Sequence, residues 1–242
     1  MMSSPPPPPT PPEIVSREEW LKARLELLAE EKALTRRRDA LNARRRQLPM
    51  VRVEKKYTFD GPTGEITLPE LFDGHRQLVV QHVMFGPDWD AACPRCAAAT
   101  SGYTRTLLDG LHERDTAFVM ICRAPIVKVE AYTWGRGWAL PWYSSYNSDF
   151  NYDFRVTLDR SFPQLEYNYR PEPGLLGDDD GSGTGSTELS GASCFLREGD
   201  EVFHTYSTFA RGMDHTDLAY AFLDLTALGR QEEWERTLQE RV

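Results

Sequence analysis

The first hydrophobic pattern in the chain is a stripe that repeats every seven residues. It consists of Trp20, Leu27, Leu34, Leu41 and Leu48. Ser16 and Glu19 precede it in the spacing of a capping box, and Pro49 follows it, where a helix has to end. Charged residues stand four positions after the stripe members, so the second apolar position of a coiled-coil heptad is missing. The pattern predicts an N-terminal helical arm over residues 13–49 with one narrow apolar face.

The length of this stripe favours association. A helix from residue 16 to residue 48 spans ~45–50 Å at 1.5 Å per residue, which is more than one compact domain needs to cover. Left exposed, the stripe is an apolar patch of the kind that promotes self-association. We therefore expect a homodimer in which the N-terminal arm crosses onto the partner.

From residue 51 onward the pattern changes to short strands and helices. The expected strands are 51–59, 78–85, 116–122, 193–196 and 201–206, and the expected helices are 94–113, 126–132 and 214–228. Buried strands that alternate with helices indicate βαβ units. Residues 50–242 are therefore predicted to form one α/β domain, with a central mixed, mainly parallel sheet flanked by helices.

Two segments are not expected to join the sheet. Residues 1–12 are Ser and Pro-rich and predict a disordered tail. Pro171–Gly191 contains six Gly, five acidic residues and no basic residue, which predicts a flexible loop. The aromatic residues of 134–154 are expected to serve the core and interfaces.

Charge and composition exclude several classes of protein. The chain of 242 residues has a net charge of −9, although residues 16–46 hold ten of its 28 basic residues. An acidic body argues against nucleic-acid binding, and no apolar run approaches the ~20 residues that span a bilayer. The N-terminus lacks the basic and apolar regions of a secretory signal. We expect a cytoplasmic protein without a cofactor, and without nucleic-acid or membrane partners.

The chemistry of the chain is concentrated in the sequence Cys93-Pro94-Arg95-Cys96, between a predicted strand and a predicted helix. Pro is favoured at the first helical position, so Cys93 is expected at the N-cap and Cys96 one turn further in. The positive end of the helix dipole and Arg95 favour a thiolate at Cys93. Cys96 is then placed to resolve a mixed disulfide. We predict dithiol–disulfide exchange, with Cys93 as nucleophile, Cys96 as resolving thiol, and a thiol or disulfide substrate or a reductant protein as partner.

Two other interpretations of this cysteine pair stay open. A zinc or copper site needs further ligands, and only His82, His112, His204 or a lone cysteine can supply them. The pair can also be incidental, in a non-catalytic protein that binds a ligand in the cleft of the fold. The remaining cysteines, Cys122 and Cys194, stand in apolar runs and are expected to be buried.

The chain resembles a bacterial family of thioredoxin-like proteins of largely unknown function, catalogued as predicted dithiol–disulfide oxidoreductases. The matching stretches are 14–20 (IVSREEW), 84–89 (MFGPDW), 93–96 (CPRC), 123–125 (RAP), 148–154 (SDFNYDF) and 203–207 (FHTYS). The resemblance covers nearly the whole chain after the Pro-rich tail. It implies a thioredoxin-like fold.

Three residues near the cysteine motif are candidates for substrate binding: Trp89, Arg95 and Arg123. Arg123 follows the second core strand, so it is expected at the carboxyl edge of the sheet, where α/β folds bind ligands. The chain departs from ordinary thioredoxins, because Ala92 stands where they carry Trp and residues 188–193 contain no Pro. It also lacks the Thr and Pro that peroxiredoxins place before their cysteine.

Overall fold

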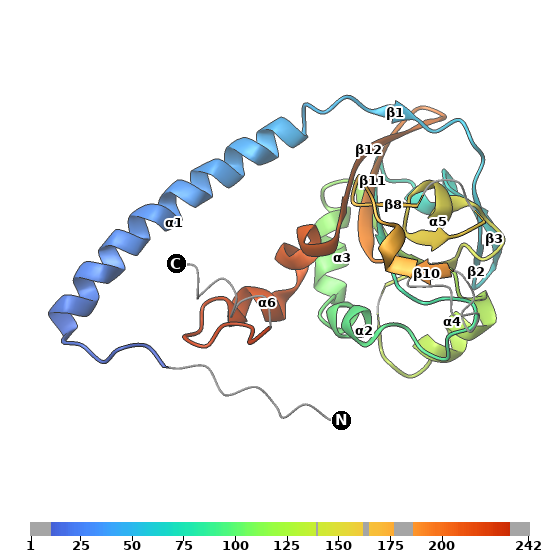
Figure 1. Ribbon diagram of the computed structural model, residues 1–242. Helices are drawn as coiled ribbons and strands as arrows, with labels where there is room; N and C mark the ends of the chain where they lie inside the picture. Colours follow the sequence, from blue (N-terminus) through green and yellow to red (C-terminus); the bar gives the residue numbers. More distant parts are fainter. Residues whose placement is uncertain (1–10, 139, 162–164, 177–185, 233–242) are drawn as a thin grey trace, which may run out of the picture. The chain divides into compact units, whose positions relative to one another are not determined.

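The computed structural model describes residues 11–138, 140–161, 165–176 and 186–232. The chain divides into two compact units, one formed by Pro49–Thr216 and the other by the residues up to Leu48 together with those from Asp217 onward (Figure 1). The sequence predicted a first boundary at residue 49. It predicted a single domain from residue 50 to residue 242, whereas the larger unit ends at Thr216. Most of the predicted Pro-rich tail, residues 1–10, lies outside the described part of the chain.

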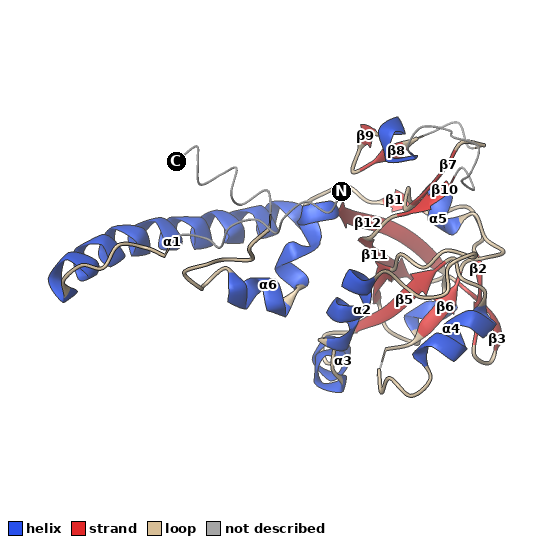
Figure 2. Ribbon diagram, turned by 60° about the horizontal axis from the view of Figure 1, so that its bottom comes forward, coloured by secondary structure: helices blue, strands red, loops and turns tan. Residues whose placement is uncertain are grey.

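An eight-stranded mixed sheet forms the centre of the larger unit (Figure 2). Its strands, in spatial order, are β1 (Val51–Arg52), β12 (Glu201–Phe209), β11 (Gly191–Glu198), β4 (Gln77–His82), β5 (Thr116–Cys122), β6 (Trp142–Ser144), β2 (Thr58–Gly61) and β3 (Gly64–Thr67). The central strands β4, β5 and β6 are parallel, and antiparallel strands flank them on both sides. Helix α2 (Pro94–Ser101) follows β4, and the β11–β12 hairpin lies on the other side of β4 from β5. This confirms the predicted α/β thioredoxin-like fold.

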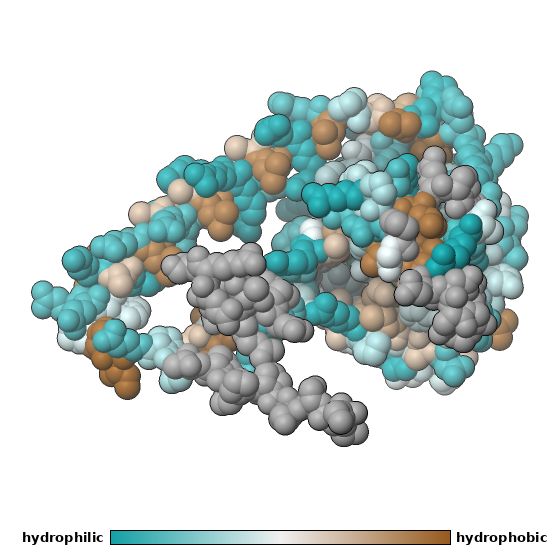
Figure 3. Space-filling view, in the orientation of Figure 1, coloured by the Kyte–Doolittle hydropathy of each residue, from teal (hydrophilic) through white to brown (hydrophobic). Residues whose placement is uncertain are grey.

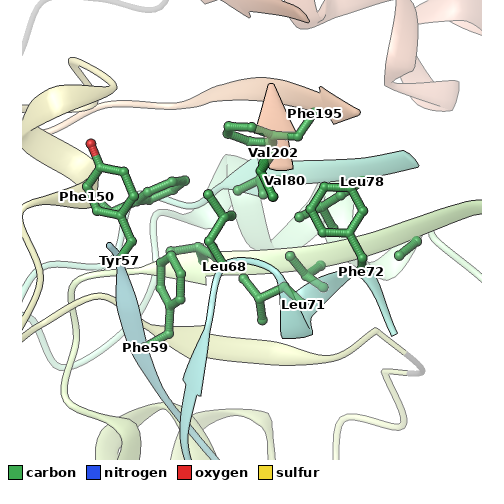
Figure 4. Close-up of a cluster of buried hydrophobic side chains, with 13 residues drawn as sticks. Tyr57, Phe59, Leu68, Leu71, Phe72, Leu78, Val80, Phe150, Phe195 and Val202 are labelled. Carbon is green, nitrogen blue, oxygen red and sulfur yellow. The ribbon is translucent and has the colours of Figure 1, made fainter. Parts of the chain in front are cut away.

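Alternate residues of the central strands enter two hydrophobic cores, which therefore lie on opposite faces of the sheet. One core receives Val119 and Ile121 of β5 and is closed by the 3-10 helix η1 (Glu70–Phe72) and by Phe150 of α5 (Phe150–Asp153); Figure 4 shows this cluster. The other core receives Met120 and Cys122 and is closed by α3 (Arg105–His112) and α4 (Ile126–Thr133). The predicted burial of Cys122 is confirmed, whereas Cys194 is half-buried.

The single helix predicted over 94–113 is two helices. Gly102 caps the C-terminus of α2, and the Thr104 hydroxyl accepts the Leu107 N–H at 3.4 Å to begin α3. The hydroxyl of Thr100 also bonds back to the carbonyl of Cys96 at 2.7 Å. The break arises because two capping residues occur within three positions, which the apolar periodicity did not reveal.

The predicted loop over 171–191 contains regular structure in its described parts. A short 3-10 helix, η2, spans Pro173–Leu176, and β10 (Ser186–Glu188) pairs antiparallel with β7 (Thr157–Asp159). Residues 177–185 lie outside the described part. The final helix is shorter than expected, since α6 covers Leu218–Leu223 after a 3-10 segment, η3, at Ala210–Thr216.

Helix α1 (Arg17–Arg45) has the capping box that the sequence predicted. Glu19 N–H donates to the Ser16 hydroxyl at 3.2 Å, and Ser16 N–H donates to the Glu19 carboxylate at 2.9 Å. All residues of α1 are described and none is buried. Hydrophobic side chains stand out along it within a polar surface in Figure 3. No helix in the described ranges is long and apolar enough to span a bilayer. The cytoplasmic location stays a prediction.

We propose that the stripe of α1 pairs with a second copy of the chain. Leu27 and Leu34 are 52% and 67% exposed, and the α1 region is basic while the rest of the chain is acidic. Replacing both leucines by Glu places charges in that contact, so sedimentation at micromolar concentration should show the dimer shifted to monomer. The control is Leu25→Glu, which lies on the opposite side of the helix at ~100° per residue. A wild-type monomer, or an equal effect of the control, contradicts the proposal.

Candidate functional site

The cysteine motif lies at the N-terminus of α2, as predicted. Cys93 is the N-cap and Pro94 occupies the first helical position. The Cys93 N–H donates to the carbonyl of Met84 at 2.8 Å, and the Cys93 carbonyl accepts the Ala97 N–H at 3.0 Å. Cys93 is therefore held between the loop that follows β4 and the first turn of α2. This fixes the start of the helix and leaves Cys96 one turn further along.

The two thiols differ in their surroundings. Both are free and half-buried. Burial raises the pKa of Cys96 to about 11, and the adjacent Cys93 side chain, with which it hydrogen-bonds, adds to that rise. Backbone hydrogen bonds at Met84 and at Cys96 itself oppose the rise. Cys96 is consequently a protonated thiol at neutral pH, in contact with the side chain of Cys93.

The loops after β4 and β5 run side by side beyond the ends of their strands. Val83 N–H donates to the Ile121 carbonyl at 2.9 Å, and Ala124 N–H donates to the Phe85 carbonyl at 2.8 Å. The parallel pairing thus continues to the carboxyl edge of the sheet. It brings the segment that precedes Cys93 next to Arg123, as the sequence predicted from the end of the second core strand.

Trp89 covers this edge instead of projecting from it. Its indole lies over Gly86, where an added Cβ would be only 3.0 Å from Trp89 Nε1. Lys128 of α4 donates to the carbonyls of Pro87 at 2.7 Å and Trp89 at 3.2 Å, which holds the turn in place. Arg95 is exposed on the first turn of α2. Trp89 therefore supports the motif by packing, and the binding roles of Trp89 and Arg95 stay predictions.

Arg123 is engaged by protein groups. Its Nη1 donates to Glu188 Oε1 at 3.2 Å, and its guanidinium lies 4.6 Å from the centre of the Tyr152 ring. The Glu188 side chain is buried, at 3% exposed, and that of Arg123 is 12% exposed. The Thr157 hydroxyl donates to the other Glu188 oxygen at 2.7 Å, and Asn151 also hydrogen-bonds that carboxylate. Arg123 is at the predicted edge, but its charge is compensated by Glu188.

Glu188 is the residue of this cluster that the sequence did not reveal, because it stood in the predicted loop. Burial raises its pKa, and the hydrogen bonds from Thr157 and the charge of Arg123 counteract that rise. Its charge also contributes to the raised pKa of Cys122. The Nε of Arg123 is buried without a hydrogen-bond partner among the described residues.

A second polar cluster crosses β4, β11 and β12. His82 Nε2 is 2.8 Å from the Ser193 hydroxyl, which is 2.7 Å from the Ser207 hydroxyl, which is 2.8 Å from His204 Nε2. A register shift between Cys194 and Phe195 brings His204 and Ser207 onto one face of β12 although they are three residues apart. We call these four residues the histidine–serine chain.

Proton counting restricts the histidine–serine chain. Its three hydrogen bonds need three protons, and the two hydroxyls supply only two. One imidazole must therefore donate through Nε2 while the other accepts. His82 Nδ1 is buried without a partner among the described residues, and a bare acceptor is less costly there than an unpaired N–H. This favours donation from His82 toward His204. A proton added to His204 would put donors at both ends, so the Ser207 hydroxyl would accept from both neighbours and its own proton would lose its acceptor.

The aromatic block after α4 lines a separate pocket of about 740 Å³. Trp138 and Trp142 stack with centroids 5.7 Å apart, and Trp134 is 88% exposed at the rim. Trp142 Nε1 is buried and lacks a hydrogen-bond partner within the described part of the chain. The block thus serves the core, as expected, and also forms a concave aromatic surface.

The ion pair of Arg123 and Glu188 makes the first prediction from this region. Arg123→Met leaves a buried carboxylate without compensation, so it should lower the free energy of unfolding by about 3–5 kcal/mol. Adding Glu188→Met should recover much of that loss. The control is Arg52→Met, whose partner Glu201 lies 2.7 Å away in an exposed pair, and which should cost under about 1 kcal/mol. Urea unfolding measures all of these. A small effect of Arg123→Met, or no recovery in the double variant, contradicts the account.

His82 makes the second prediction. Burial, together with the nearby His204, lowers the pKa of His82 from 6.5 to about 3. Below pH 6.5, His82 therefore binds a proton in the unfolded chain but not in the folded chain. As the pH is lowered, the free energy of unfolding falls by up to about 1.4 kcal/mol per pH unit. His82→Gln removes this proton uptake, so its unfolding free energy should fall less between pH 6.5 and 4.5 than that of the wild type. Parallel pH profiles for the two proteins would contradict the assignment.

Comparisons with known proteins place the chain in a family. No curated protein matches its sequence. Among solved structures it is similar to peroxiredoxin Q of Xanthomonas campestris (TM-score 0.47, 15% identity, covering 71% of this chain and 91% of that one). It is also similar to peroxidoxin BcpB of Mycobacterium tuberculosis (TM-score 0.43, 15% identity, 70% and 93%) and to a hypothetical protein of Sinorhizobium meliloti 1021 (TM-score 0.41, 13% identity, 76% and 90%).

These similarities are too distant to assign an activity. The family model is more extensive, since it matches residues 9–241 and so includes nearly all the motifs noted in the sequence. The chain belongs to the family described as bacterial protein of unknown function, DUF899.

Proposed function

We propose that this protein carries out dithiol–disulfide exchange through Cys93 and Cys96. One observation carries the proposal: Cys93 caps α2 while Cys96 lies one turn further in and hydrogen-bonds with it. Two thiols that are one helical turn apart and hydrogen-bonded to each other can close a disulfide without a large movement of the backbone. The free N–H groups of the helix N-terminus lie beside Cys93 and favour an anionic sulfur there.

The first half of the reaction joins Cys93 to the substrate. The Cys93 thiolate attacks one sulfur of a substrate disulfide, a Cys93–substrate S–S bond forms, and the substrate S–S bond breaks. The second substrate sulfur leaves as a thiolate and takes a proton from the medium. Cys96 stays protonated during this step because burial raises its pKa to about 11.

The second half releases the substrate. Cys96 gives up its proton to the departing sulfur and attacks Cys93, which forms the Cys93–Cys96 disulfide and frees the remaining substrate thiol. Two electrons pass from the protein to the substrate, and a dithiol reductant restores the protein by the reverse sequence. Coupling this proton transfer to the attack gives the high pKa of Cys96 a role, since the thiol becomes nucleophilic only when a bound sulfur can accept its proton.

The alternative of a soft-metal site has less support. Within the described ranges, no three His, Cys, Asp or Glu side chains cluster as metal ligands do. His82 and His204 bond to serines, and His75 and His112 stack on each other at 4.5 Å. The ligand-binding alternative has one observation in its favour, which is the aromatic pocket of about 740 Å³. Trp134, Trp138 and Trp142 line that pocket, which is suited to a flat apolar molecule.

Cysteine variants test the exchange proposal. Cys93→Ser should abolish disulfide reductase activity, because it removes the attacking sulfur. In Cys96→Ser, Cys93 should still attack the substrate, but the mixed disulfide should accumulate because no thiol resolves it. Mass spectrometry detects this mixed disulfide as a covalent adduct on Cys93. Iodoacetamide should alkylate Cys93 before Cys96 in the reduced wild type.

The matched control is Cys194→Ser, a half-buried lone cysteine, which should keep wild-type activity. Faster alkylation of Cys96 would reverse the roles of the two thiols. Full activity of Cys93→Ser would remove the proposal and leave ligand binding in the aromatic pocket as the stronger candidate.

A further inference from the structure

A small hairpin between β7 and β10 lies apart from the main sheet. Its strands are β8 (Glu166–Tyr167) and β9 (Arg170–Pro171), and Glu172 N–H extends the ladder to the Leu165 carbonyl at 2.9 Å. Both turn residues have positive φ, 51° at Asn168 and 62° at Tyr169, which is the geometry of a type I′ hairpin turn. We call residues 165–172 the strap.

Two tyrosine hydroxyls fasten the strap to the sheet. Tyr167 donates to the carbonyl of Ser190 at 2.9 Å and accepts the N–H of Ala210 at 2.9 Å. Tyr169 donates to the carbonyl of Ser207 at 3.1 Å. The rings of both tyrosines pack on Phe209, at 5.6 and 5.7 Å between centroids. At its base, Glu166 pairs with Arg155. The strap is therefore anchored at several points along its length.

Ser190, the anchor of Tyr167, lies beside the cysteine motif. Gly191 at the start of β11 pairs with His82 at the end of β4. One residue beyond each, Ser190 and Val83 are neighbours, and the next residue, Met84, accepts the N–H of Cys93. Burial raises the pKa of Tyr167, and its hydrogen bonds with Ala210 and Ser190 counteract that rise. The Tyr167 hydroxyl is thus bound to the backbone residue that neighbours Val83, on the loop that holds the Cys93 N–H.

An extended polypeptide that paired with the backbone before β11 would lie beside Val83 and so next to the loop whose Met84 carbonyl accepts the Cys93 N–H. A peptide that docks along a strand edge needs unoccupied backbone carbonyls and N–H groups. The Ser190 carbonyl is occupied by Tyr167. The next residue, Gly191, already pairs with His82 on one side and Phe209 on the other, so β11 offers no free edge there. Cys93 is nevertheless partly exposed at the first turn of α2.

We propose that Tyr167 excludes polypeptide disulfides from this site, and that the substrate is a low-molecular-weight disulfide. The proposal rests on the exchange function proposed above. A small disulfide RS–SR reaches Cys93 from the side of α2 and needs no backbone pairing. It accepts two electrons and two protons and leaves as two RSH molecules, while Cys93 and Cys96 form their disulfide. Within the strap, Tyr167 thus acts as the residue that determines specificity.

The test compares two probes on the reduced full-length chain. The probes are 2-hydroxyethyl disulfide, a small molecule, and insulin, a polypeptide. The wild type should reduce the small probe with a kcat/KM about 100-fold above that for insulin, a difference of about 2.7 kcal/mol in transition-state binding. Tyr167→Ala should reduce the ratio of kcat/KM for the small probe to kcat/KM for insulin at least about tenfold, mainly through a lower KM for insulin.

Two further variants separate specificity from damage to the fold. Tyr167→Phe keeps the ring packed on Phe209 but removes the hydroxyl that binds the Ser190 carbonyl. It should therefore also reduce the ratio of the two kcat/KM values, by less than Tyr167→Ala does. The control is Tyr169→Phe, which loses the bond to Ser207 in the same strap and should leave the ratio unchanged. A wild type that reduces insulin as fast as the small probe overturns the role of Tyr167 while exchange stands. If neither the wild type nor Tyr167→Ala reduces either probe, exchange itself is refuted and this inference with it.

Discussion

The buried ion pair between Arg123 and Glu188 is the interaction on which the arrangement of the site depends. A carboxylate and a guanidinium taken out of water are costly unless each finds a partner with good geometry. Here the two residues come from segments far apart in the sequence: Arg123 directly follows β5, and Glu188 is the last residue of β10. Their pairing fixes how the segment before β11 meets the loops after β4 and β5. Thr157 and Asn151 complete the hydrogen bonds of the Glu188 carboxylate. Two further polar side chains are therefore placed in the interior to stabilise this one charge.

The position of the thiols follows from this pairing. Glu188 approaches Gly86 so closely that a Cβ there would lie 3.3 Å from its Cγ, and the same loop carries Met84, the acceptor for the Cys93 N–H. Two residues past Glu188, the Ser190 carbonyl receives the hydroxyl of Tyr167. The ion pair therefore positions two backbone segments of the site. One is the loop with Met84 and Gly86, and the other is the segment before β11, along which a substrate chain would lie. It also explains why Arg123 need not touch substrate to matter for the reaction.

The sequence predicted the parts of this site that depend on local rules. Pro94 fixes the start of α2, so Cys93 and Cys96 could be placed from four consecutive residues. Arg123 could be placed because parallel strands end at a common edge. Glu188, Ser190 and Tyr167 could not be placed. The segment that contains Glu188 and Ser190 is rich in Gly and acidic residues, and the positions of all three residues depend on β10–β7 pairing and on bonds between distant residues. The same holds for His204 and Ser207, which share a face only because of a register shift that no periodicity reveals.

The short helix α5 connects the two polar clusters. Phe150 and Phe154 pack against His82, at 5.8 and 6.3 Å between ring centroids, while Asn151 and Tyr152 contact the ion pair. Successive residues of one turn thus serve the histidine–serine chain on one side and Arg123 and Glu188 on the other. A buried polar network is costly when some of its hydrogen bonds are missing. A shift of this turn would therefore destabilise the histidine–serine chain and the ion pair together. That double demand accounts for the density of aromatic and amide residues in 148–154, and it links the stability of the sheet to the geometry of the thiol site.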